Sequence, residues 1–127
     1  MRDTCVCVDL LLRREYVLDK VKEVGVKNCS VSEITLAELY YGAAKSGQER
    51  HFNDVALIQQ MFQIVPCFNS LRLFGEQRVL LEKAGNCIDD FDLMIGVSAI
   101  SNKMVMVTDN TKHFERISDI VLENGKK

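Results

Sequence analysis

The sequence predicts an α/β domain in which a short parallel sheet is covered by helices on both faces. Short apolar segments typical of strands alternate along the chain with longer segments of helical periodicity. The composition, 47% hydrophobic and 27% charged, is that of a globular chain and not of a disordered one. With 127 residues, one proline and no Gly/Ser-rich linker, we expect a single domain over residues 1–127.

Helix and strand signals alternate in the first half of the chain. Residues 14–25 carry apolar side chains at helical spacing and end at a glycine, which is a common C-cap. The segment "NCSVS" over 28–32 is typical of a short strand, and Ser32 can cap a helix over 33–47. Apolar positions at helical spacing predict the next helix over 49–63.

The same alternation continues to the end. A short strand is predicted over 64–67, where a proline ends it, and a helix over 70–85 ends at a glycine. The nearly all-apolar segment 90–101 is predicted to be helical, and "MVMV" over 104–107 is typical of a buried strand. The last elements are a short helix over 111–117 and a strand over 120–122. In such sheets, ligands bind beyond the carboxyl ends of the strands.

Composition also narrows the class of function. A net charge of −2 excludes a global basic field for nucleic acid, although a local patch or a metal could still bind RNA. No apolar run approaches the ~20 residues of a membrane span and no signal peptide is recognisable, so we expect a cytoplasmic protein without membrane contact. Five cysteines without a CxxC pair, and only two histidines, favour reduced thiols over a disulfide framework or a zinc site.

Several acidic residues stand in places where solvation alone does not explain them. Asp92 has almost only apolar neighbours in its helix, so its carboxylate must be paired, protonated or bound to a cation. Glu38 lies in the equally apolar "ITLAELYYGA". Asp89 is explained as a helix N-cap, Asp3 as a polar terminal residue and Asp109 as an Asx-turn, when each is taken alone.

Taken together, these acids suggest one cluster. Carboxylates that lie a few ångströms apart repel one another, and a divalent cation removes the conflict. Oxygen ligands without histidine or cysteine point to Mg²⁺ or Mn²⁺. Such an ion lowers the pKa of a water molecule and neutralises a phosphodiester during in-line attack.

Three segments give the chain a family resemblance. They are "DTCVCVDLL", "SVSEITLAELYYGA" and "IDDFDLMIGVSAISNKMVMVTDNTKHFERI". In this order and at these separations, they resemble PIN-domain ribonucleases, and in particular VapC-type toxins of bacterial toxin–antitoxin pairs. The resemblance implies a PIN-like three-layer sandwich, with the short parallel sheet between two layers of helices.

The resemblance also implies functional residues. Asp3, Glu38 and Asp92 match the family's catalytic acids, and Asp90 is a frequent companion. Many relatives have a further acid where this chain has Asn110, directly after Asp109. The implied metal ligands are Asp3, Glu38, Asp90, Asp92, and Asn110 or Asp109. If the register of the family holds, Asn110 faces the metal and Asp109 turns away.

One segment is predicted differently by its residues and by the resemblance. The β-branched residues of "CVCVDLLL" favour a strand, whereas the resemblance makes this segment a helix that begins just after Asp3.

The predicted function is a Mg²⁺- or Mn²⁺-dependent endoribonuclease, the toxin of a type II toxin–antitoxin pair. A metal-activated water would attack the phosphorus of RNA without a covalent intermediate. Expected partners are RNA, a cognate antitoxin and a second copy of the chain in a homodimer. The basic residues Lys45, Lys112 and Arg116 are candidates for phosphate contacts, although each is more often a solvated helix charge.

Two alternatives remain. A non-catalytic PIN-like binding module stays open because only two residues precede Asp3 and because Asn110 stands where many relatives have an acid. A phosphoacceptor receiver domain has a similar length and an acidic Mg²⁺ pocket. It needs an acidic pair near the N-terminus and a mid-chain strand that ends in aspartate, and the sequence has neither.

Overall fold

The computed structural model describes residues 6–8, 25, 28–108 and 110–124. Asp3, Asp109 and the predicted helix over 14–25, apart from Gly25, lie outside these residues. In chain order the described elements are β1 (Val6–Val8), β2 (Cys29–Ser32), α2 (Glu33–Ser46), α3 (Glu49–Met61), β3 (Gln63–Val65), the 3₁₀ turn η2 (Phe68–Ser70), α4 (Leu71–Ala84), α5 (Asp90–Ser101), β4 (Val105–Thr108), α6 (Thr111–Phe114) and β5 (Leu122–Asn124).

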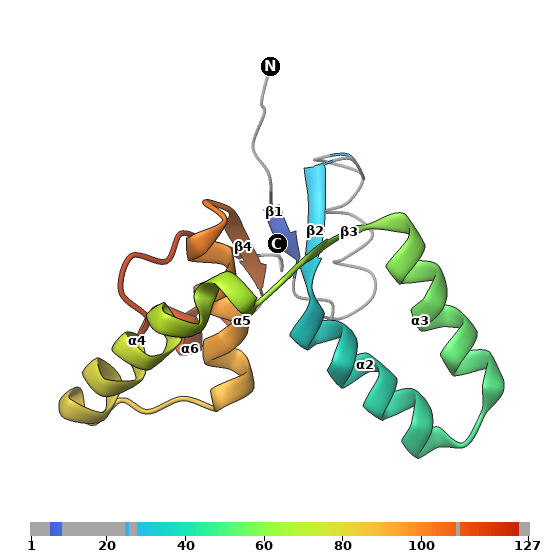
Figure 1. The fold of residues 1–127 in the computed structure, drawn as a ribbon, viewed down its shortest axis with the longest axis horizontal. Helices are drawn as coiled ribbons and strands as arrows, with labels where there is room; N and C mark the ends of the chain where they lie inside the picture. Colours follow the sequence, from blue (N-terminus) through green and yellow to red (C-terminus); the bar gives the residue numbers. More distant parts are fainter. Residues whose placement is uncertain (1–5, 9–24, 26–27, 109, 125–127) are drawn as a thin grey trace.

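The described strands form one five-stranded sheet in the order β3-β2-β1-β4-β5. Every neighbouring pair is parallel, as predicted. The central strand β1 pairs with β2 on one side and with β4 on the other, so that Val6 lies opposite both Cys29 and Val105. Helices α2 and α3 lie on one side of this sheet and α4, α5 and α6 on the other (Figure 1).

Side chains alternate between the two faces of the sheet and build two cores. Val8 and Val107 pack with the residues of α2 and α3, whereas Cys7 and Met106 pack with those of α4, α5 and α6. All four side chains are at most 1% exposed, as expected for a parallel sheet covered on both faces. The predicted α/β fold with a parallel sheet between helical layers is therefore confirmed.

Local signals set the ends of the helices. The hydroxyl of Ser32 accepts a hydrogen bond from the backbone N–H of Ile34 at 3.0 Å and so caps α2. Helices α2 and α4 end at Gly47 and Gly85, whose φ angles of 70° and 71° lie in the left-handed region that glycine tolerates. Asp89 caps α5 by accepting from the N–H of Phe91 at 3.0 Å. These four caps were predicted.

The helix implied by the resemblance just after Asp3 is wrong for residues 6–8. Val6–Val8 is a strand, as the β-branched residue types favoured. These residues lie between β2 and β4, and a helix there could not satisfy the backbone hydrogen bonds of both neighbouring strands. The acidic residue that directly follows β1 in the chain is Asp9, and not Asp3.

The last elements differ from their predicted bounds. The predicted helix over 111–117 ends at Phe114, and the chain then turns so that both Phe114 and Ile117 are buried against α5. The side chain of Gln77 holds this turn by two hydrogen bonds to the backbone of Ser118, at 3.2 and 3.3 Å. The final strand lies two residues later than predicted, at Leu122–Asn124.

The described residues include four of the five cysteines. Cys7, Cys29, Cys67 and Cys87 are free thiols, the first two buried, which agrees with the predicted absence of a disulfide framework there. Burial raises the pKa of Cys29 to about 11, which keeps this thiol protonated and unreactive. No helix within the described part of the chain is long and apolar enough to cross a bilayer.

Candidate metal and catalytic site

The candidate site lies at the carboxyl edge of the sheet. Helix α2 begins where β2 ends, and α6 follows directly after β4. Helix α5 precedes β4 and runs back across the sheet, so its first turn reaches the same edge (Figure 1). Helix α5, which carries Asp92, contacts both α2, which carries Glu38, and α6, which carries His113.

Asp92 meets a histidine at this edge. Its Oδ2 atom lies 3.0 Å from Nε2 of His113, a residue of α6. The side chains of Asp92 and His113 are only 29% and 23% exposed, so the contact is largely shielded from water. The sequence predicted that this carboxylate would be paired, protonated or bound to a cation, and the described structure pairs it.

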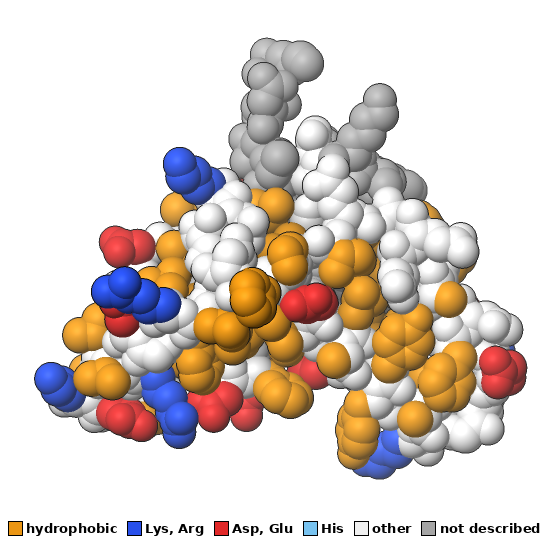
Figure 2. Space-filling model, in the orientation of Figure 1, with side chains coloured by type: hydrophobic (Ala, Val, Ile, Leu, Met, Phe, Trp, Pro, Cys, Tyr) orange, Lys and Arg blue, Asp and Glu red, His pale blue; other side chains and the backbone are white. Residues whose placement is uncertain are grey.

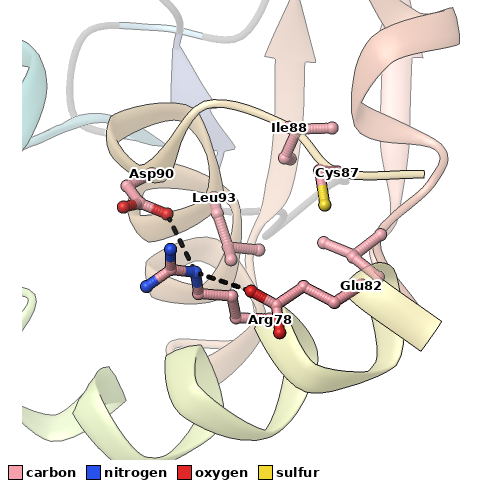
Figure 3. Close-up of a pocket in the computed structure, with 7 residues that line it drawn as sticks. Arg78, Glu82, Cys87, Ile88, Asp90 and Leu93 are labelled. Atoms are coloured by element: carbon pink, nitrogen blue, oxygen red, sulfur yellow. Dashed lines mark ion pairs between the residues drawn. The ribbon is translucent and has the colours of Figure 1, made fainter. Parts of the chain in front are cut away.

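Asp90 lies on a different side of α5. Its Oδ1 atom is 3.5 Å from Nε of Arg78, which is also 3.5 Å from Oε2 of Glu82 on α4 (Figure 3). Arg78 and Asp90 are both about half exposed. The three residues line a small hollow between α4 and α5, together with Leu93 and three others (Leu81, Cys87 and Ile88). The structure therefore does not bring Asp90 to the histidine that holds Asp92.

Glu38 projects from the second turn of α2. It is only partly exposed, and its Oε1 atom is buried. The surrounding helix buries Thr35 and Leu36, and α2 as a whole contacts α5. Glu38 is therefore shielded on a helix that meets α5, and its grouping with the other acids stays a prediction.

The loop after β4 is described on both sides of Asp109. The hydroxyl of Thr108 accepts a hydrogen bond from the N–H of Asn110 at 3.1 Å, which holds the loop close to the end of the strand. Asn110 is exposed at the N-cap of α6, and its side chain makes no capping bond. Its backbone carbonyl accepts from the N–H groups of His113 and Phe114. Whether Asn110 or Asp109 faces the metal stays a prediction.

A second contact fixes the same edge beside β3. The backbone N–H of Cys67 donates to Oε1 of Glu33, the first residue of α2, at 2.8 Å. This hydrogen bond, together with one from the Cys67 thiol, lowers the pKa of Glu33 below its ordinary value. The same carboxylate raises the pKa of the Cys67 thiol. Glu33 therefore links the segment after β3 to the start of α2, and its carboxylate is engaged in this structural hydrogen bond.

The donors described at this edge suit a small divalent cation. Glu38 and Asp92 offer carboxylate oxygens in a partly water-excluded setting, which is the ligand type that Mg²⁺ and Mn²⁺ prefer. Within the described ranges, no three His, Cys, Asp or Glu side chains are grouped closely enough to form a metal site by themselves. Two of the predicted ligands, Asp3 and Asp109, fall outside those ranges.

The three candidate phosphate contacts lie in different settings. Lys45, in the last turn of α2, stands 5.9 Å from the ring centre of Tyr41. Lys112 is exposed on α6, next to the histidine that holds Asp92. Arg116 donates to the backbone carbonyl of Cys87 at 3.1 Å. Of these three, Lys112 is nearest in the chain to the candidate site.

The sequence reasoning did not identify His113. A signal was present, because His113 is one of only two histidines and lies in the segment after the last predicted buried strand. Its partner on α5 could not be inferred from spacing, because 21 positions separate the two residues.

Large hydrophobic side chains remain exposed around this edge. Phe68 in η2 is 80% exposed, and Phe91 at the start of α5 is 54% exposed. Tyr41 on α2 is 66% exposed. Figure 2 shows hydrophobic surface that continues across the middle of one face, whereas the basic groups gather mainly toward one end. A hydrophobic surface of this kind is typical of a contact with another protein.

Comparisons with known proteins agree with this fold. The family model for the PIN domain matches residues 1–120. Ribonuclease VapC2 of Rickettsia felis is 33% identical, with 100% of this chain and 98% of that protein covered. Ribonuclease VapC2 of Haemophilus influenzae is 32% identical, with 98% and 96% covered. A tRNA(fMet)-specific endonuclease VapC of Salmonella typhimurium is 29% identical, with 98% and 96% covered.

Solved structures are similar over the same length. A chain in the crystal structure of VapBC2 from Rickettsia felis, bound to a DNA fragment from its promoter, superposes with a TM-score of 0.82. It is 28% identical, with 95% of this chain and 98% of that chain covered. A chain in DNA-bound VapBC from Salmonella typhimurium gives a TM-score of 0.84 at 27% identity, with 96% and 98% covered. The chain belongs to the PIN-domain family, as a member of its VapC ribonuclease group.

Proposed function

We propose that this chain is the toxin of a type II toxin–antitoxin pair and that it cuts RNA with the help of Mg²⁺ or Mn²⁺. The observation that carries the proposal is the shielded Asp92 carboxylate at the carboxyl edge of the sheet, in a chain that is similar to VapC ribonucleases over its whole length.

Each residue of the candidate site has a separate proposed role. Glu38 and Asp92 would hold the cation, together with Asp3 and with Asn110 or Asp109, and a bound cation supplies a water of lowered pKa and neutralises phosphate charge. Lys112, exposed beside the site, would contact a phosphate of the RNA. Asp90 would act from outside the innermost set of ligands, because Arg78 engages its carboxylate.

A protein partner is part of the proposal. The structural relatives from Rickettsia felis and Salmonella typhimurium are VapBC complexes. The exposed aromatic side chains of Tyr41, Phe68 and Phe91 give this chain hydrophobic surface for such a partner, the antitoxin, and for a second copy of itself. A homodimer is expected in light scattering. A monomer at tens of micromolar would count against the contact with a second copy of the chain.

The test is RNA cleavage by the purified chain. Total tRNA is a suitable substrate because the Salmonella typhimurium and Shigella flexneri relatives are named tRNA(fMet)-specific endonucleases. We expect cleavage with Mn²⁺ or Mg²⁺, none with a chelator, and none by Glu38→Gln. The matched control is Glu76→Gln, at an exposed position on α4 paired with Arg72, which should retain full activity. Chelator-resistant cleavage, or no cleavage by the wild type on any RNA, would contradict the proposal.

A further inference from the structure

His113 is held in place by its surroundings as well as by Asp92. The next residue, Phe114, is 2% exposed and packs in the core with α5. The ring of Phe114 meets the imidazole edge-on, with 5.3 Å between ring centres. The backbone N–H groups of both residues donate to the carbonyl of Asn110. The imidazole is therefore presented to Asp92 by a fixed turn of backbone and not by a freely moving side chain.

The packing of α5 against this segment leaves little room for adjustment. Gly96 lies on α5, one turn after Asp92, and a β-carbon there would come within 2.5 Å of the side chain of Ile117. A larger residue at this position would force the end of the Ile117 side chain to move. Asp92 and His113 therefore lie on two segments that are packed together in the core, which favours a pre-arranged pair of ligands.

The distance between the two side chains suits a metal as well as a hydrogen bond. Two ligand atoms about 2.1 Å from an octahedral ion, at right angles to each other, are about 3.0 Å apart. The measured separation of His113 Nε2 and Asp92 Oδ2 is 3.0 Å. A cation that replaced the shared hydrogen would lie to one side of the line between the two atoms, and the two side chains would turn toward it while keeping their separation.

We propose that His113 is a direct nitrogen ligand of the catalytic cation, beside Asp92, so that the site prefers Mn²⁺ to Mg²⁺. This inference rests on the metal-dependent function proposed above. It changes the predicted ligand set from oxygen alone to oxygen and nitrogen. Imidazole nitrogen is a common ligand of first-row transition ions, whereas Mg²⁺ strongly prefers oxygen.

Calorimetric titration tests the preference between ions. The wild type is titrated with Mn²⁺ and with Mg²⁺, without RNA, and is compared with His113→Gln. The control is His51→Gln, because His51 on α3 is the only other histidine of the chain. We expect His113→Gln to weaken Mn²⁺ binding about tenfold or more and Mg²⁺ binding far less, and His51→Gln to change neither. Equal losses for both ions in His113→Gln would contradict nitrogen ligation.

Pulsed electron paramagnetic resonance tests ligation directly. A nitrogen bound to Mn²⁺ produces nuclear modulation of the manganese signal, and only two histidines can supply an imidazole nitrogen. Modulation should appear in the wild type and in His51→Gln, and should disappear in His113→Gln. Bound Mn²⁺ without nitrogen modulation in the wild type overturns this inference alone and leaves His113 as a hydrogen-bond partner of Asp92. No Mn²⁺ or Mg²⁺ binding at all by the wild type overturns the metal-dependent function itself.

Discussion

Asp90 and Asp92 stand two positions apart at the start of α5, yet they lie in different environments. Asp90 is about half exposed and meets Arg78 on α4 at 3.5 Å. Asp92 is 29% exposed and meets His113 on α6 at 3.0 Å. Two residues separated by two positions in a helix point to nearly opposite sides, because each residue turns the helix by about 100°.

This difference shows that two identical side chains on one helix can have different roles, because they lie on different sides of it. The side of α5 that faces α4 carries a solvated ion pair, which contributes little to stability. The side that faces α6 carries a shielded carboxylate beside an imidazole, in a setting where charges interact strongly. The acidic character of the segment alone would make the two aspartates equivalent, whereas the helical phase distinguishes them.

The largest expected effect is a difference in RNA cleavage between variants of Asp92 and of Asp90. Asp92→Asn should lower RNA cleavage by about 100-fold or more, because it removes a negative ligand from the cation. Its melting temperature without metal should be equal or higher, because one of several like charges is removed while the amide oxygen can still accept from His113. Asp90→Asn should lower cleavage by much less. The measurements are initial cleavage rates and thermal unfolding, and equal losses of rate would show that Arg78 does not hold Asp90 away from the metal.

The next effect concerns the packing that places Asp92 beside His113. Gly96→Val should lower the free energy of unfolding by about 1–3 kcal/mol, because the added methyl groups meet Ile117 in the core. Gly75 on α4 provides the contrast, because a β-carbon there has open space. Gly75→Ala should raise the free energy of unfolding by up to about 1 kcal/mol through helix propensity. Urea unfolding measures both, and an unchanged stability of Gly96→Val would show that the core around Ile117 can accommodate the added methyl groups.

A smaller effect is expected in the loop after β4. If Asn110 faces the metal, Asn110→Asp should tighten Mg²⁺ binding about fivefold, since a carboxylate near a cation adds about 1 kcal/mol in a solvated setting. Asp109→Asn should then change the affinity little. Calorimetric titration of the two variants measures this difference. A large loss of affinity in Asp109→Asn, with no gain in Asn110→Asp, would assign the ligand to Asp109.

The smallest effect is expected on the solvated side of α5. Arg78→Gln removes the guanidinium that meets both Asp90 and Glu82, and both contacts are 3.5 Å long and half exposed. Cleavage and melting temperature should stay close to those of the wild type, because exposed ion pairs contribute little. If instead Mn²⁺ affinity rises clearly in Arg78→Gln, Asp90 has been released toward the metal and belongs to the inner set of ligands.

Much of the fold could be predicted because its signals are local. Ser32, Gly47, Gly85 and Asp89 define helix ends through short-range chemistry that a sequence displays directly. The alternation of strand and helix segments then implied a parallel sheet, and the described strands form one. The acids in apolar surroundings suggested one cluster, and the family resemblance added which residues belong to it.

What could not be predicted depends on contacts between distant segments. The strand Val6–Val8 is short enough to suit either structure, and its pairing with β2 and β4 decides between them. The contact between Asp92 and His113 depends on how α6 docks on α5, which the burial of Phe114 and Ile117 determines. Local propensity carries no information about such docking.

The position of β1 in the sheet also determines when the protein becomes functional during its synthesis. Val6 is made long before Val105, which is one of its two partners in the sheet. The centre of the sheet cannot close until β4 has emerged from the ribosome, and such non-local pairing is slow to form. Helix α6, which carries His113, is made later still. A nascent or prematurely terminated chain without β4 and α6 would therefore lack the contact between Asp92 and His113.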